Sequence, residues 1–110
     1  MRKLLSNPSI EELKEVSKDI AQLSDVCNVI LFGSRARGSN RPSSDVDLMV
    51  IINDDHIDTF EETVKIELGL TVSMSMDLIV VSKNDFENFK HIPGSVYKRA
   101  ALEGISLYGS

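Results

Sequence analysis

The sequence predicts an α+β fold of two layers, with a small mixed sheet in an αβαβαβ order and the helices largely on one face of it. Three apolar runs rich in β-branched residues are typical of strands, and the segments around them carry helical signals. With 110 residues, of which 42% are hydrophobic, the chain is expected to form one domain, residues 1–110, around a modest core.

A capping box predicts the first helix. Ser9 and Glu12 have the spacing at which each side chain binds the backbone N–H of the other residue. The apolar residues of this segment recur at helical intervals: Ile10, Leu13, Val16, Ile20 and Leu23. We expect this apolar face to pack against the sheet.

The first strand is expected at residues 27–32, and it ends at Gly33 and Ser34. A glycine at this point suits a sharp turn from a strand into a helix. Such a turn exposes backbone N–H groups that bind anions at the positive end of the helix, and the Ser34 hydroxyl can donate a hydrogen bond to a phosphate. No Gly-Lys-Ser/Thr sequence follows Gly33, so P-loop ATPase chemistry is not expected.

Two carboxylates stand at the start of the second expected strand, residues 46–52. Because side chains alternate along a strand, Asp45 and Asp47 share one face at a separation of about 6 to 7 Å. Ligand sets made only of oxygen favour Mg²⁺, which takes one or two carboxylates and fills its other positions with water and substrate phosphates. The pair therefore suits a metal ion that arrives with a nucleoside triphosphate.

Asp77 is the candidate third acid. It lies in the third expected strand, residues 71–81, on a face that is polar at first and apolar further along. Because the face of Asp45 and Asp47 has the same order, we expect the two strands to be parallel and joined by a crossover of about twenty residues. The helical pattern expected in this crossover consists of Ile57, Phe60, Val64 and Leu68.

The first strand is expected to run antiparallel to the other two, because only this direction brings Gly33 to the strand starts that carry the acids. Beyond the third strand, Ser82 indicates the start of a short helix. Residues 93–95 then break the chain before a helix at about residues 96–103, and residues 105–108 form an expected edge strand.

Charge and cysteine content exclude several classes of protein. A net charge of -5 argues against a broad nucleic-acid surface, so extended nucleic-acid binding is not expected. The single cysteine, Cys27, excludes an internal disulfide and fits the reducing cytoplasm. Since no apolar segment is long enough to span a membrane, we expect a cytoplasmic protein with no membrane partner.

The segment from Gly33 to Leu48 resembles the DNA polymerase β-like nucleotidyltransferase superfamily. It has a Gly-Ser pair, a gap of ten residues that contains Arg-Gly and Arg, and a closing Ser-Asp-x-Asp-Leu. Within that superfamily, the chain is most similar to the minimal nucleotidyltransferases, or MNT proteins, whose short chains contain little beyond the catalytic core. The resemblance implies that Gly33, Ser34 and Ser44 bind the nucleotide.

The resemblance also implies a metal site. Asp45 and Asp47 would hold two Mg²⁺ ions, and Asp77 would complete the site as a further ligand or as the general base. ATP is the nucleotide donor that the resemblance implies.

Three arginines lie in the gap between the Gly-Ser pair and the acids. Arg35, Arg37 and Arg41 are candidate nucleotide-binding residues, and two other roles stay open for them. They can contact the acceptor protein instead, or they can support the loop alone.

By this resemblance, the chain is expected to transfer AMP from ATP to a hydroxyl, most simply a tyrosine, of a HEPN-domain toxin. Such a toxin cleaves RNA, and the modification neutralises it, so the chain would act as the antitoxin. Two alternatives stay open. The chain can be a non-catalytic binding module that inhibits its partner by occlusion, or it can modify a small molecule such as an aminoglycoside antibiotic.

Overall fold

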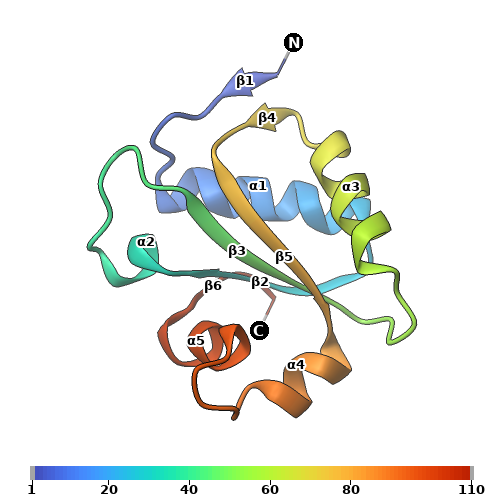
Figure 1. Cartoon of the computed structure of the whole chain (residues 1–110). Helices are drawn as coiled ribbons and strands as arrows, with labels where there is room; N and C mark the ends of the chain where they lie inside the picture. Colours follow the sequence, from blue (N-terminus) through green and yellow to red (C-terminus); the bar gives the residue numbers. More distant parts are fainter. Residues whose placement is uncertain (1, 110) are drawn as a thin grey trace.

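The computed structural model describes residues 2–109 and contains a four-stranded mixed sheet with helices against both faces (Figure 1). The elements follow in this order: β1 (Lys3–Leu4), α1 (Ile10–Leu23), β2 (Val26–Phe32), α2 (Ser34–Arg37), β3 (Val46–Ile52), α3 (Thr59–Gly69), β4 (Val72–Ser73), β5 (Met76–Ser82), α4 (Lys83–Phe89), α5 (Val96–Glu103) and β6 (Ile105–Gly109). The predicted α+β class is confirmed.

The four-stranded sheet has the order β5-β3-β2-β6. β3 and β5 are parallel, whereas β2 is antiparallel to both β3 and β6. The strand directions inferred from the positions of the acids are therefore confirmed. The crossover from β3 to β5 contains α3, as predicted.

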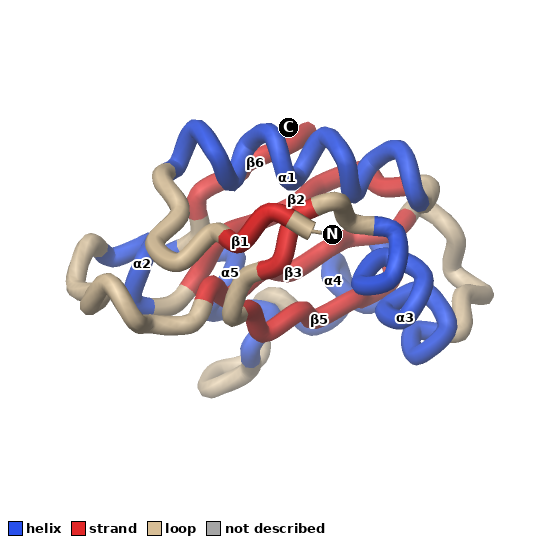
Figure 2. The backbone as a smooth tube through the Cα atoms, turned by 90° about the horizontal axis from the view of Figure 1, so that it is seen from above, coloured by secondary structure: helices blue, strands red, loops and turns tan. Residues whose placement is uncertain are grey.

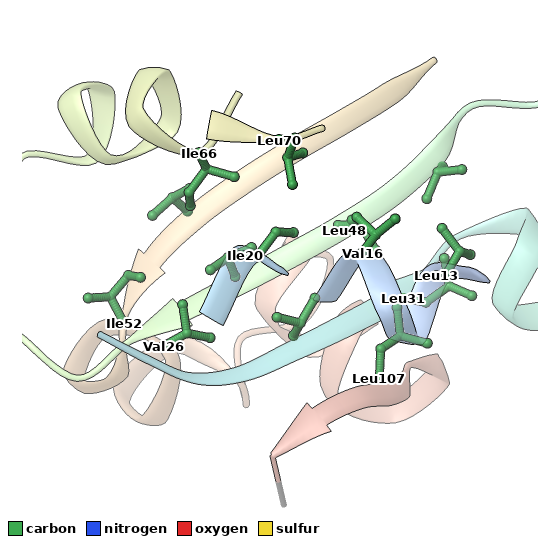
Figure 3. Packing of buried hydrophobic residues seen from close by; sticks show 14 of the residues in the cluster. Leu13, Val16, Ile20, Val26, Leu31, Leu48, Ile52, Ile66, Leu70 and Leu107 are labelled. Atoms are coloured by element: carbon green, nitrogen blue, oxygen red, sulfur yellow. The ribbon is translucent and has the colours of Figure 1, made fainter. Parts of the chain in front are cut away.

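α1 and α3 cover one face of the sheet and enclose the main core (Figure 2). The capping box of α1 is present: the Ser9 hydroxyl accepts a hydrogen bond from the Glu12 N–H, and the Ser9 N–H donates one to Glu12 Oε1, both at 3.1 Å. Figure 3 labels ten side chains of this core: Leu13, Val16, Ile20, Val26, Leu31, Leu48, Ile52, Ile66, Leu70 and Leu107.

α4 and α5 pack against the opposite face. They cover a second apolar cluster from three strands: Ile30, Phe32, Met49, Ile51 and Val81. The prediction that the helices lie largely on one face therefore fits the two longest helices, α1 and α3, but not these two. The physical reason is that β2 and β3 are apolar on both faces, so both faces must be shielded from water.

One local prediction is corrected, and one pattern is buried only in part. The strand expected at residues 71–81 is split, because β4 leaves the main sheet and pairs in parallel with β1. In α3, the buried residue is Ile66, whereas Phe60 and Leu68 of the predicted pattern are 75% and 72% exposed. No helix within residues 2–109 is long and apolar enough to cross a membrane.

Candidate active site

Three carboxylates lie at one end of the sheet, where β3 and β5 begin and β2 ends. Asp47 is the register partner of Asp77 on the parallel neighbour β5 and of Phe32 on the antiparallel neighbour β2. Asp45 immediately precedes β3. Side chains two or four residues apart along a strand point to the same face of the sheet. The acids have this spacing from Met49 and Val81 of the second apolar cluster, so they lie on the sheet face that α4 and α5 cover.

The acids influence one another electrostatically. Burial is the largest cause of a raised pKa at Asp47, and the negative charges of Asp77 and Asp45 raise this pKa further. Arg99 and Arg37 act in the opposite direction. Because like charges close together repel, a cation placed between these carboxylates would relieve the repulsion.

Gly33 is required at the turn on two grounds. Its φ of 75° lies in the left-handed region, which residues with a side chain rarely adopt. A Cβ atom on Gly33 would also overlap Asp47 Oδ2. The turn that starts α2 is therefore packed directly against the central carboxylate, as the antiparallel direction expected for β2 predicted.

α2 is only one turn long. Its single turn is closed by the Arg37 N–H, which donates to the Gly33 carbonyl at 3.2 Å. The first N–H groups of a helix have no partner within the helix, so those of Ser34 and the next two residues are suited to bind an anion. The predicted Gly-Ser turn thus lies beside the acids, with Ser34 half-buried.

Arg35 holds the loop between α2 and β3. Its guanidinium donates to the carbonyls of Ser44, at 2.9 and 3.2 Å, and of Pro42, at 3.1 Å. It also donates to Asn7 Oδ1 at 3.1 Å. These contacts favour the supporting role that the sequence left open for Arg35 over direct phosphate binding.

Ser44 also stabilises this loop. Its hydroxyl accepts a hydrogen bond from the Arg41 N–H at 2.9 Å, and its own N–H donates to the Arg41 carbonyl at 2.9 Å. The Arg41 side chain is exposed. Arg37 extends in another direction and forms an ion pair with Glu103 of α5 at 3.0 Å.

Two residues near the acids were not predicted. Ser75, just before β5, donates a hydrogen bond from its hydroxyl to Asp45 Oδ1. The positive charge of Arg99 of α5 lowers the pKa of Asp47 more than that of Arg37 does. Neither belongs to the Gly33–Leu48 segment, so only the way the chain folds reveals them.

The acids fit Mg²⁺ as an ion shared with a substrate rather than as a resident ion. Within residues 2–109, no group of three or more histidine, cysteine, aspartate or glutamate side chains is arranged to hold a metal by itself. Carboxylate oxygens are hard ligands, and Mg²⁺ commonly takes only one or two of them, with water and phosphate oxygens completing the octahedron. The negative charges of Asp45 and Asp77 next to Asp47 would attract such an ion.

Residues 13–105 match the model of the nucleotidyltransferase domain family. The chain belongs to this family. The matched residues include the Gly-Ser turn, all three acids and α5. The predicted resemblance is thereby confirmed, and so is the prediction that the protein is a transferase.

A curated relative supports the same family. The chain is 35% identical over 74 residues to a "putative protein adenylyltransferase" of Methanocaldococcus jannaschii, and the alignment covers 64% of this chain and 73% of the relative.

Solved structures support the fold. The chain is similar to the crystal structure of a "putative nucleotidyltransferase" from Sulfolobus solfataricus, with a TM-score of 0.66, 18% identity, and coverage of 91% of this chain and 79% of the other. A toxin–antitoxin complex with AMP-PNP aligns less well, with a TM-score of 0.49, 20% identity, and coverage of 88% and 73%.

Proposed function

We propose that this nucleotidyltransferase transfers AMP from ATP to a hydroxyl group of a partner protein. The observation that supports this most is the convergence of Asp45, Asp47 and Asp77 on the Gly33 turn, in a chain of the nucleotidyltransferase family. The name of the relative from Methanocaldococcus jannaschii supports protein as the acceptor.

At the α-phosphorus, the proposed reaction forms one bond and breaks one. The acceptor oxygen attacks the α-phosphorus of ATP, and the bond from that phosphorus to the oxygen bridging to the β-phosphate breaks. Pyrophosphate leaves with the electron pair, and the hydroxyl proton passes to Asp77 or to water. When bound, Mg²⁺ supplies neutralisation of the phosphate charge and a lower pKa for the acceptor hydroxyl.

The chain's own residues would position these groups. Asp45 and Asp47 would hold the metal, and Ser75 would fix the orientation of Asp45 through its hydrogen bond. The backbone at Gly33 and Ser34 would bind the triphosphate, while Arg35 and Ser44 would keep the loop in place. Asp77 would lie toward the acceptor, where a general base is needed.

We further propose that the acceptor is a tyrosine on a HEPN-domain toxin and that the chain acts as its antitoxin in the cytoplasm. Asp45 and Asp77 are exposed, so the acids are accessible to a residue on the surface of another protein. The net charge of -5 also suits a basic, RNA-binding partner.

A labelling experiment tests this function. The purified protein is incubated with Mg²⁺, ATP labelled at the α-phosphate, and the product of the reading frame next to its gene. We expect label on the companion with the wild type and none with the Asp45→Ala/Asp47→Ala double variant, and we expect peptide mapping to find AMP on a tyrosine. Protection from the toxin by the double variant at equal concentration would instead support inhibition by occlusion.

A further inference from the structure

α3 carries two large apolar side chains that are exposed to solvent. Phe60 is 75% exposed and Leu68 is 72% exposed. Val64, which is half-buried, lies four residues from each of them, and side chains four residues apart are neighbours on a helix surface. The three residues therefore form an apolar stripe along the outer side of α3, while Ile66 on the inner side packs in the core.

The net charge of the chain is concentrated around this stripe. Residues 54–69 contain six acidic residues and one lysine, which gives a formal charge of -5, the net charge of the whole chain. The remaining 11 acidic and 11 basic residues cancel. Glu61 and Glu67 are each three residues from Val64 and are exposed beside the stripe. In the part of the chain that the structure describes, neither of these two glutamates forms an ion pair.

This α3 surface, which consists of Phe60, Val64 and Leu68 with Glu61 and Glu67, lies beside the edge of the sheet that carries the acids. α3 packs along β5, the strand at one edge of the four-stranded sheet (Figure 2). Because α3 is the crossover between the parallel strands β3 and β5, its C-terminal end lies toward the starts of these strands. Leu68 is therefore at the end of α3 that is nearer to the exposed Asp77. A protein that covers α3 reaches the acids around the edge of β5.

We propose that the α3 surface is the docking site of the acceptor protein, and that the acceptor contributes an apolar segment flanked by lysine or arginine side chains. This inference rests on the proposed function and deepens it, because it names the surface that the partner covers. Protein interfaces commonly have an apolar centre and a polar rim, and opposite charges across the rim speed the encounter of the two proteins. The apolar stripe and its two glutamates have this arrangement.

The charge favours this occupant over the alternatives. Two copies of the chain would bring the same charge of -5 in residues 54–69 face to face, and like charges that meet oppose binding. Lys65 offsets little of this repulsion, since it is already paired with Glu62 of its own helix at 3.1 Å. Nucleic acids and anionic lipids are repelled by the same acidic side chains. A basic protein surface gains from both the stripe and its acidic border.

Binding of the purified product of the reading frame next to the gene, measured by calorimetry without ATP, tests the proposal. We expect Phe60→Ala/Leu68→Ala to weaken the complex by about 10- to 100-fold, because two apolar contacts at the centre of the interface are removed. Leu102→Ala is the matched control. Leu102 of α5 is 74% exposed but lies outside the α3 surface, so this variant should bind like the wild type.

A second pair of variants tests the acidic border separately. We expect Glu61→Gln/Glu67→Gln to slow association with the companion by about 10-fold at low salt, and to make the association rate less dependent on ionic strength. Glu11→Gln/Asp19→Asn removes the same charge from exposed positions of α1 and should associate like the wild type. Equal slowing by both pairs would assign the effect to the net charge and overturn the role of the acidic border.

The outcomes separate docking from catalysis. Asp45→Ala/Asp47→Ala should bind the companion without labelling it, whereas Phe60→Ala/Leu68→Ala should lose both binding and labelling and still bind Mg²⁺-ATP. Wild-type affinity in Phe60→Ala/Leu68→Ala would overturn the docking site and leave the transferase proposal standing. Binding that depends on Phe60 and Leu68, without any transfer of AMP, would support the docking site and count against the transferase proposal.

Two further results would also overturn the docking site. One is a wild type that does not bind the companion, and the other is self-association of the wild type that Phe60→Ala/Leu68→Ala abolishes, measured by analytical ultracentrifugation. Because both side chains are exposed, the double variant should unfold at the temperature of the wild type. Circular dichroism and thermal unfolding check this, and Leu68→Ala alone replaces the double variant if that one is not folded.

Discussion

At the scale of single residues, Asp47 is the centre of the proposed site. It lies between Asp77 and Phe32 in the sheet, touches the Gly33 turn, and carries the raised pKa of the acid group. The surrounding backbone is the common cause of these features. It holds the Asp47 carboxylate next to the other carboxylates and partly withdrawn from water. Such an arrangement costs stability in the absence of a cation.

This cost predicts a stabilised variant. Asp47→Asn removes the repelling charge, so we expect the free energy of unfolding at neutral pH to rise by about 0.5 kcal/mol. The gain is small because water screens the charge of a half-buried carboxylate. The same variant should lose transferase activity by about 100-fold or more, because a metal ligand is removed. Urea unfolding and label transfer measure the two effects, and Asp58→Asn, a change at the N-cap of α3 away from the acids, is the control.

The pKa direction at Asp47 sets the sign of a pH effect. Because the folded protein binds this proton more tightly than the unfolded chain, stability falls as the pH rises from the ordinary value of 3.8 through the raised pKa, and then levels off. Asp47→Asn has no such contribution. The difference in unfolding free energy between variant and wild type should therefore grow across that interval, and a constant difference would contradict the raised pKa.

Gly33 gives a prediction with a steric cause. Gly33→Ala places a Cβ against Asp47 Oδ2 and requires a residue with a side chain at a φ of 75°. We expect destabilisation of about 1–3 kcal/mol together with loss of Mg²⁺-ATP binding. Gly38→Ala provides the matched control, because Gly38 also has a φ of 75° but nothing lies within 4 Å of its added Cβ. If both variants bind Mg²⁺-ATP equally, the contact of Gly33 with the acid has no functional role.

At the scale of elements, the loop between α2 and β3 depends on Arg35. Arg35→Ala removes hydrogen bonds to Ser44, Pro42 and Asn7, so we expect a loss of about 1–2 kcal/mol and faster amide hydrogen exchange at residues 38–45. Lysine should not substitute, since one ammonium group does not reproduce the planar set of donors. Arg41→Ala should leave the exchange unchanged, because only the backbone of Arg41 binds Ser44. Slow exchange in the loop of Arg35→Ala would contradict the supporting role.

The comparison of sequence with structure is also clearest at the scale of elements. The parallel pairing of β3 and β5 was predicted correctly from the positions of their acids. The order of polar and apolar residues along a strand can be read from the sequence of that strand alone. The helical spacing in α3 did not show which side is buried, since Phe60 and Leu68 are exposed whereas Ile66 packs in the core. The pairing of β1 with β4 was missed because two-residue strands carry no periodicity.

The same limits apply to the site. The Gly33–Leu48 segment could be recognised because its chemistry is contiguous in the sequence. Ser75 could not, because its contact with Asp45 depends on how β5 pairs with β3. The sequence also could not show which arginine supports the loop, because acceptors such as Asn7 come close to Arg35 only in the folded chain.

At the scale of the whole molecule, the two faces of the sheet differ in role. α1 and α3 enclose the larger core on one face, while the face of α4 and α5 combines a smaller core with the acids at its end (Figure 2). The proposed site is thus made by the end of the sheet and the Gly33 turn together. Ligand binding should stabilise all of them at once, because a ligand that binds only the folded state raises the free energy of unfolding of the whole domain.

This whole-molecule effect can be measured by thermal unfolding. ATP with Mg²⁺ should raise the unfolding temperature of the wild type, and EDTA should abolish the increase while leaving the protein without ligand unchanged. The Asp45→Ala/Asp47→Ala variant should show no increase. An equal increase from ATP in the presence of EDTA would show that nucleotide binding does not depend on a metal at these acids.

The central claim is that the chain transfers the nucleotidyl group of ATP, and the position of the label tests it most directly. Parallel reactions with the partner protein use ATP labelled at the α-phosphate or at the γ-phosphate. We predict that label appears on the partner only from the α-position, with release of pyrophosphate, and that Asp45→Ala/Asp47→Ala abolishes it. Transfer from the γ-position, or transfer from the α-position that survives in the double variant, would contradict the proposed chemistry and its site.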